Sequence, residues 1–346
     1  MAESIKRYDP TITTDLANSP SRRVPSMNGC CRKSAKRLIP RPYWPGSPYG
    51  GSSSGDPTQG DRHTWDIWHG RMAPYQEYPA YGARFVSEFG MQALPHRATI
   101  NRFAPLEEQV PDSRTLAHHN KAEGGVRRLA AYLADNLRPP ADLDGMIYAT
   151  QLIQAEAMAA AIRGWRRNFK GPGAYAMAGA LIWQLNDCWP VTGWALVDYE
   201  LRPKSAYYAV KRALAPLVVE LAKTENGADL WVVSQLAEPV AATVHVDMWT
   251  LGGERLARVE RILQLLPHQA TALPPFRYDV PETVVLGAQL LVDRVVVSRS
   301  VLWPEPLKYL DLPDPELTLH REGDCVRLRV QRPAKGIWLD GGDGVA

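Results

Sequence analysis

Residues 84–92 read Arg-Phe-Val-Ser-Glu-Phe-Gly-Met-Gln, and this stretch decides the predicted fold. Its first half is apolar and β-prone, as expected of a buried strand. The strand ends in the carboxylate of Glu88 and is interrupted at Gly90. Parallel α/β enzymes keep their chemistry where strands end, so Glu88 is a candidate site residue. On these nine residues alone the plainer interpretation, a solvated or helix-capping glutamate, is favoured.

Length and composition limit the class of protein. The chain has 346 residues, enough for two or three domains. Its 40 basic and 37 acidic residues give a net charge of +3, which argues against a general nucleic-acid or membrane-surface role. The 11 Trp and 14 Tyr against 5 Phe suit stacking on sugars, or alternatively a tryptophan-rich core.

Neither the cysteines nor the hydropathy of the sequence indicates a secreted protein or a membrane protein. The 4 cysteines offer neither metal-ligand spacing nor a disulfide framework, so a reducing, cytoplasmic location is favoured. No apolar run reaches the roughly 18 to 20 residues of a membrane span. The amino terminus has no apolar core of a signal peptide. Residues 1–33, rich in Pro, Ser and Thr with one basic cluster, are predicted to be an unstructured leader.

A second stretch rich in candidate site residues precedes the Glu88 strand. Residues 63–70 bring together His63, Trp65, Asp66, Trp68 and His69. The histidines and Asp66 lack the i, i+4 spacing of a helical metal pair, so no metal site is predicted. The pattern favours a site lined for hydrogen bonding and stacking. The alternative is that one or two of the aromatic residues simply belong to the core.

After the Glu88 strand the pattern alternates between helix and strand. Helices are predicted over 118–137, 143–168 and 205–214, with prolines and glycines between them. Residues 178–190 again form a buried strand that opens into polar and aromatic residues. Two strand-then-site units separated by helices indicate consecutive steps of a (β/α) barrel.

The last third of the chain has a β pattern. Short strands are predicted at 230–233, 242–249 and 288–292, a spacing that fits an antiparallel sandwich. Further strands at 317–320 and 326–330 begin a second β unit.

Four separated motifs carry a specific resemblance. Residues 41–51, 63–70, 84–92 and 179–199 together resemble, in this order, the carboxyl-terminal half of the catalytic barrel of family-2 glycoside hydrolases of the β-mannosidase type. The resemblance extends over roughly residues 34–346. It implies the C-terminal half of a (β/α)8 TIM barrel, an immunoglobulin-like β-sandwich and the start of a second sandwich.

The resemblance also divides the chain. An unstructured or aberrant leader spans 1–33, and the carboxyl-terminal part of the barrel spans 34–213. The sandwich then covers 214–305, and the beginning of a truncated β domain covers 306–346.

The implied function is retaining hydrolysis of terminal, non-reducing β-D-mannose residues from oligosaccharides or glycoconjugates. The resemblance implies that Glu88 is the nucleophile and that Trp183 floors the sugar subsite. The other implied substrate-binding residues are His63, Trp65, Trp68, His69, Asn186 and Asp187. The carboxylate mechanism requires no metal and no organic cofactor.

A retaining glycosidase needs a second carboxyl group as acid/base, about 5 to 5.5 Å from the nucleophile. The family places it in an Asn-Glu motif, and this sequence contains no Asn-Glu dipeptide. Asp66, Asp187 and Asp198 are weak stand-ins, since loop hydrogen bonding explains at least the last two equally well. We therefore expect a fragment that lacks the acid/base glutamate and is inactive alone.

Two other functions remain open. One is a non-catalytic carbohydrate-binding module that uses Trp65, Trp68 and Trp183 as a platform. The other is a family-2 glycosidase for another β-sugar, such as galactose, glucuronic acid or glucosamine. The oligomeric state is left open.

Overall fold

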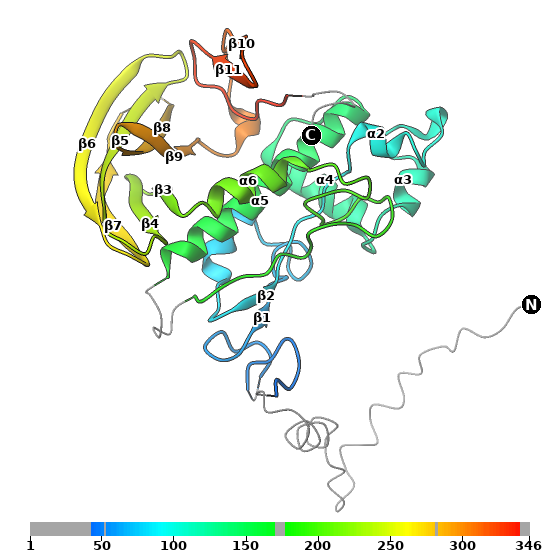
Figure 1. Ribbon diagram of the computed structural model, residues 1–346. Coiled ribbons are helices and arrows are strands. Elements are labelled where there is room, and N and C mark those ends of the chain that lie inside the picture. Colours follow the sequence, from blue (N-terminus) through cyan, green and yellow to red (C-terminus); the bar gives the residue numbers. More distant parts are fainter. Residues whose placement is uncertain (1–42, 52, 170–176, 281–282, 340–346) are drawn as a thin grey trace, which may run out of the picture. The chain divides into compact units, whose positions relative to one another are not determined.

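A computed structural model describes residues 43–51, 53–169, 177–280 and 283–339 (Figure 1). The leader predicted over 1–33 lies outside these residues. The described residues from Pro48 onward form one compact unit. A helical region comes first along the chain, followed by strands.

The helical region is built on one long helix. Helix α5 (Leu143–Arg167) begins at Asp142, whose carboxylate accepts a hydrogen bond of 2.7 Å from the Gly145 amide. This confirms the helix predicted over 143–168. Helix α6 (Ser205–Ala213) packs against it and also matches its prediction.

The helix predicted over 118–137 is wrong in extent. The structure has α3 (Arg114–His118) and α4 (Gly125–Asn136) instead. Gly124 separates them with a φ of +67°, a left-handed conformation that glycine adopts without strain. Residues 95–111, for which the sequence predicts a loop, contain the short helices α2 (Arg97–Ile100) and η3 (Leu106–Glu108). Another short helix, η2 (Tyr75–Tyr81), precedes the Glu88 strand.

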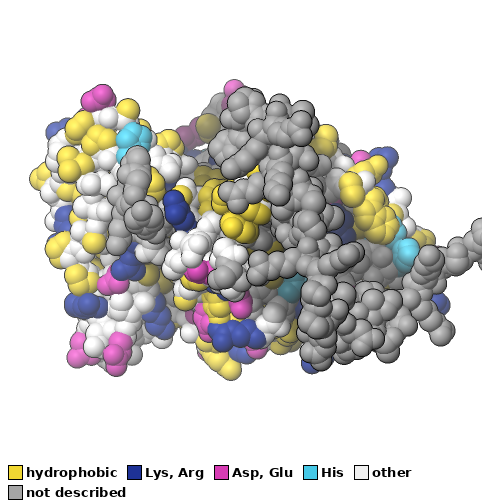
Figure 2. Space-filling view, turned by 90° about the horizontal axis from the view of Figure 1, so that it is seen from below, with side chains coloured by type: hydrophobic (Ala, Val, Ile, Leu, Met, Phe, Trp, Pro, Cys, Tyr) yellow, Lys and Arg dark blue, Asp and Glu magenta, His cyan; other side chains and the backbone are white. Residues whose placement is uncertain are grey.

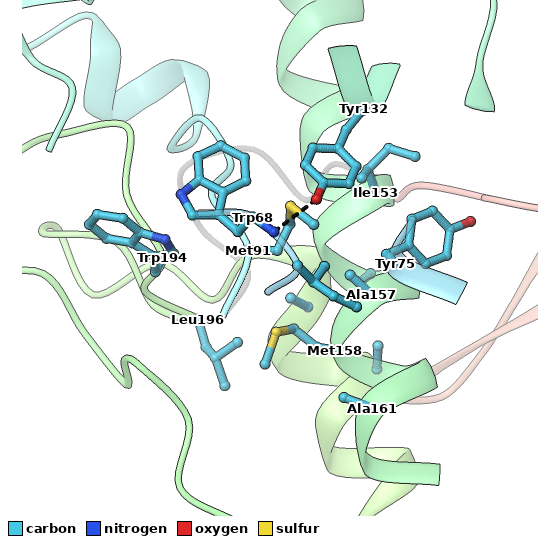
Figure 3. Packing of buried hydrophobic residues seen from close by; sticks show 14 of the residues in the cluster. Trp68, Tyr75, Met91, Tyr132, Ile153, Ala157, Met158, Ala161, Trp194 and Leu196 are labelled. Carbon is cyan, nitrogen blue, oxygen red and sulfur yellow. Dashed lines mark hydrogen bonds between the residues drawn. The ribbon is translucent and has the colours of Figure 1, made fainter. Parts of the chain in front are cut away.

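One face of α5 forms the core of the helical region. Ala157, Met158 and Ala161 are fully buried there (Figure 3). Near the end of the helix, the Trp165 indole donates to the Tyr78 carbonyl at 3.0 Å and packs edge-on against Phe89. The segment after Glu88 is therefore anchored on α5.

Three short segments run parallel beside one another around Glu88. Strand β1 (Arg62–His63) pairs with β2 (Val86–Glu88), and Val86 also bridges Ala180. The strand predicted at 84–88 is present in shortened form. The one predicted within 178–190 is reduced to that bridge and a second one between Asn186 and Val197. Each segment makes only a few ladder hydrogen bonds, so the described residues do not confirm the half barrel.

The predicted antiparallel sandwich is confirmed. One sheet has the order β3–β4–β7 and the other β6–β5–β8–β9. The strands are β3 (Leu217–Thr224), β4 (Gly227–Ser234), β5 (Val240–Thr250), β6 (Arg255–Leu265), β7 (Gln269–Arg277), β8 (Val284–Val292) and β9 (Val295–Leu302). Alternate residues of both sheets, such as Val232, Val244 and Val246, fill one shared core.

The second β unit is a hairpin. After η4 (Leu307–Tyr309), β10 (Thr318–Glu322) pairs antiparallel with β11 (Cys325–Arg329). Both strands are exposed along their whole length. The strands predicted at 317–320 and 326–330 are thus present.

Arginines at the end of α5 contact the sandwich. Arg163 pairs with Glu220 of β3 at 3.1 Å, and Arg167 pairs with Asp229 of β4 at 2.9 Å. The Arg167 guanidinium also lies 4.6 Å from the centre of the Trp231 ring. These contacts are charge-assisted and cation–π interactions.

The described surface mixes charges of both signs. On the face seen in Figure 2, basic and acidic side chains are interspersed with hydrophobic ones. This agrees with the nearly balanced composition. Among the described residues, no helix combines the length and the apolar character needed to cross a membrane.

Candidate active site

The carboxylate of Glu88 is held through one of its oxygens. The Trp65 indole donates a hydrogen bond of 3.0 Å to Oε2. The same oxygen lies 3.3 Å from Nδ1 of His63. Within the described residues no hydrogen bond reaches Oε1, and the Glu88 side chain is 26% exposed. One oxygen is therefore fixed and the other is open.

Backbone pairing sets this geometry. His63 lies opposite Glu88 in the β1–β2 register, and the Thr64 amide donates to the Glu88 carbonyl at 2.8 Å. On the other side, the Trp183 amide donates to the Phe89 carbonyl at 2.9 Å. The segments carrying His63 and Trp183 thus flank the Glu88 strand.

Glycine at position 90 permits this close approach. A Cβ atom there would lie 2.2 Å from the carbonyl oxygen of Trp183, far inside contact distance. It would also crowd Trp65 and Trp194, at 3.3 and 3.2 Å. The glycine of the sequence motif therefore has a packing role.

Trp183 presents an open aromatic face. Its side chain is 42% exposed, and the peptide bond to Gln184 is cis. Leu181 and Leu185, two residues away on either side, are also exposed. Trp183 thus lies in a stretch with several exposed apolar side chains.

His69 and Trp194 extend the aromatic group around Trp65. The ring of Trp65 lies 5.1 Å from His69 and 6.0 Å from Trp194, with 5.6 Å between the latter two. Burial, together with the nearby Arg128, lowers the pKa of His69. The imidazole is therefore neutral at pH 7. Trp194 was not a predicted site residue, although it lies within the 179–199 motif.

Trp68 belongs to the core. It is fully buried and stacks on Tyr132 at 6.0 Å. Its amide donates to the Tyr132 hydroxyl at 2.8 Å, the dashed line in Figure 3. The described structure leaves no face of this ring free for a sugar, as the core interpretation of the motif anticipated.

Asn186 and Asp187 have different environments. The Asp187 carboxylate is fully buried, 2.9 Å from Nζ of Lys121 and 3.3 Å from the Gln184 amide nitrogen. Asn186 is exposed, and its amide donates to the Asp187 carbonyl. Asp187 thus forms a buried ion pair, and nothing in the sequence identified Lys121 as its partner.

The other acids considered are engaged in local structure. Asp66 pairs with Arg62 at 2.8 Å. Asp198 accepts from the Thr99 hydroxyl at 2.6 Å and from two backbone amides that follow it. The part of the chain that the structure describes holds no cluster of three or more His, Cys, Asp or Glu residues suited to a metal.

Comparisons with known proteins find related sequences and a related fold. Residues 226–309 match the family described as "Mannosidase Ig/CBM-like domain". The chain is 41% identical over 340 residues to "Beta-mannosidase B" of Emericella nidulans, covering 90% of this chain and 40% of that protein. The Aspergillus niger protein of the same name is 41% identical over 332 residues, covering 88% and 39%.

A solved structure shares the fold. The β-D-mannosidase of Dictyoglomus thermophilum matches with a TM-score of 0.75 and 33% identity, over 81% of this chain and 34% of that one. The chain spans about 40% of the length of the curated relatives it matches. By sequence and by fold, the chain is thus a homologue of these proteins named β-mannosidase.

Proposed function

We propose that the chain carries the nucleophile side of a retaining β-mannosidase, with Glu88 as the nucleophile. The observation that carries the proposal is the Glu88 carboxylate at the end of β2, with Trp65 and His63 on Oε2 and Oε1 open. The exposed ring of Trp183 comes from the neighbouring segment. The 41% identity to proteins named β-mannosidase B supports the same assignment.

The geometry suits attack on an anomeric carbon. The Trp65 N–H stabilises charge on Oε2 and fixes the carboxylate plane, because hydrogen bonds to ionised groups are strong and directional. Oε1 then attacks the anomeric carbon while the bond to the glycosidic oxygen breaks, and the acid/base carboxyl gives its proton to that oxygen. The result is a covalent glycosyl-enzyme intermediate, which water, deprotonated by the same acid/base group, later hydrolyses. His63 adds a second restraint on the same oxygen.

The proposed substrate is a terminal, non-reducing β-D-mannose residue of an oligosaccharide or glycoconjugate. Trp183 supplies a flat apolar face on which a sugar ring stacks. Asn186 is exposed, and His69 is partly exposed beside Trp65. We assign these three residues to substrate contact and assign Trp65 and His63 to positioning of the carboxylate.

We further propose the domain division predicted above. Residues 34–213 would form the carboxyl-terminal part of a catalytic (β/α)8 barrel. The parallel order of β1, β2 and the Ala180 segment, with helices between the last two, supports this. The sandwich would cover 214–305, and a further β domain would begin at 306.

The acid/base carboxyl is proposed to come from sequence outside these 346 residues. The chain contains no Asn-Glu dipeptide, and Asp66, Asp187 and Asp198 all have other partners. We therefore expect the chain alone not to hydrolyse 4-nitrophenyl β-mannoside. A version extended by an upstream Asn-Glu strand should do so.

The same assay separates the parts of the proposal. If the chain alone hydrolyses the substrate and Glu88→Gln abolishes this hydrolysis, the acid/base group is not missing from the chain. Glu88 would then remain the nucleophile. Turnover by the extended protein that survives Glu88→Gln would refute the nucleophile. Mannoside binding that survives Glu88→Ala, with no hydrolysis in either protein, would favour a non-catalytic carbohydrate-binding module.

A further inference from the structure

A cavity of about 270 Å³ lies between α5, α6 and the segment Gly336–Trp338. Its floor includes Ala155, Ala159 and Ala209, which are nearly buried and whose short side chains leave the space open. None of the candidate active-site residues lines it. We call it the α5–α6 cavity.

Two guanidinium groups line the cavity. Arg163 on α5 pairs through Nε with Glu220 at 3.1 Å. Among the described residues, no hydrogen bond reaches its terminal nitrogens. Likewise, no hydrogen bond from the described residues reaches any nitrogen of the Arg212 guanidinium on α6. Partial burial and the charge of Arg163 lower the pKa of Arg212, as expected when two cations share a restricted space.

The charges around the cavity do not balance. The cations are Arg163, Arg212 and Lys335, and the carboxylates that pair with them are Glu156 and Glu220. Glu156 is already engaged by Lys335 at 2.8 Å. Burial also raises the pKa of Glu220 to about 7, so its negative charge is only partial near neutral pH. The group therefore keeps a net positive charge that an anionic ligand would offset.

The other end of the cavity is aromatic and apolar. Trp338 lies with its ring 6.0 Å from Tyr148, next to Leu152. The Tyr148 hydroxyl donates to the Gly336 carbonyl at 2.8 Å. A Cβ at position 336 would lie 2.3 Å from that hydroxyl, and the residue has a φ of +69°, so glycine permits this close approach.

We propose that the α5–α6 cavity binds a small organic monoanion, a planar carboxylate joined to an apolar or aromatic body. The carboxylate bonds to Arg163 and Arg212, since guanidinium groups match carboxylates in a bidentate geometry. The apolar body lies on the alanine floor against Trp338. The volume is near the lower end of ligand pockets, which suits a molecule of about benzoate size.

Calorimetric titration of the purified chain with benzoate tests the proposal. Saturable binding is expected, and Arg212→Gln should weaken it on the order of tenfold to a hundredfold, as for a lost charge-assisted hydrogen bond. Lys211→Gln is the matched control, because it removes the same charge at a neighbouring position that does not line the cavity. It should leave the affinity unchanged.

A second variant tests the space independently of charge. Ala209→Leu fills the floor, so benzoate should no longer bind, with folding verified by the melting temperature. Benzamide, neutral and of the same shape, should not bind to the unmodified chain. The proposal is overturned if benzoate shows no saturable binding, if benzamide binds equally well, or if Arg212→Gln and Ala209→Leu both leave benzoate binding intact.

Discussion

The indole Nε1–H of Trp65 donates a hydrogen bond of 3.0 Å to Oε2 of Glu88, across 23 positions of sequence. This contact fixes the plane of the carboxylate. The register of β1 and β2 brings the two residues together, because His63 lies opposite Glu88 and Trp65 follows two residues later. This register explains why the aromatic motif at 63–70 and the acidic motif at 84–92 lie on neighbouring strand segments.

Removing this hydrogen bond should slow formation of the glycosyl-enzyme. With 2-deoxy-2-fluoro-β-mannosyl fluoride, whose fluoride departs without a proton donor, Trp65→Phe should lower the rate constant of covalent labelling by about tenfold to a hundredfold. Mass spectrometry follows the reaction. Trp249→Phe in the sandwich is the control and should label at the original rate. An unchanged rate in Trp65→Phe would rule out the positioning role.

Gly90→Ala should destabilise the protein. The added methyl group would come within 2.2 Å of the Trp183 carbonyl oxygen, which is backbone and cannot swing aside. We expect a loss of at least about 2 kcal/mol in the free energy of unfolding, measured with urea. Gly287→Ala is the matched control, because nothing lies within 4 Å of a Cβ there. Equal stability of the two variants would contradict the packing described.

The Lys121–Asp187 pair should be structural. Lys121→Met leaves the buried Asp187 carboxylate without its cation and should cost about 3 to 5 kcal/mol in the free energy of unfolding. The double variant with Asp187→Leu should recover much of that loss. Asp144→Asn removes a carboxylate of an exposed pair with Arg97 and should cost under about 1 kcal/mol. If Lys121→Met lowers the free energy of unfolding by as little as Asp144→Asn does, the buried pair does not stabilise the fold.

Glu220 should make stability depend on pH. Burial raises the pKa of Glu220 to about 7, against the opposing effects of Arg163, the Ser300 hydroxyl and Arg166. With a folded pKa above the unfolded value of 4.5, the contribution is fully present below pH 4.5 and is lost as pH rises through about 7. Between pH 5 and 8 the free energy of unfolding should fall by an amount on the order of 2 kcal/mol.

Urea unfolding at several pH values measures this slope. In Glu220→Gln the part of the slope due to Glu220 should disappear, whatever the absolute stability of the variant. Glu238→Gln, at an exposed position, should keep the original slope. An unchanged slope in Glu220→Gln would show that this carboxyl stays ionised over the whole range.

Periodicity predicted the longest helix and part of the sandwich. Helix α5 and strands β4, β5 and β8 follow from apolar spacing, whereas β3, β6, β7 and β9 were not predicted. The helix predicted over 118–137 is too long, because α4 begins only after Gly124, whose left-handed conformation apolar spacing does not reveal. The strand expected within 178–190 is reduced to isolated bridges at Ala180 and Asn186, because the segment is paired only at scattered positions.

The candidate site was predictable as motifs but not as contacts. Glu88, Trp65 and His63 were all identified from sequence, yet their convergence on one carboxylate oxygen depends on strand register. Trp68 and Asp187 have the same residue types as site residues. Only packing reveals that Tyr132 covers the first and that Lys121 pairs with the second.

The nature of the Glu88 carboxylate is tested most directly by mass spectrometry of the chain after incubation with 2-deoxy-2-fluoro-β-mannosyl fluoride. The account predicts a covalent fluoromannosyl adduct on the peptide that carries Glu88, and no adduct in Glu88→Gln. An adduct on another carboxylate, an adduct that persists in Glu88→Gln, or no adduct on the unmodified chain would contradict it.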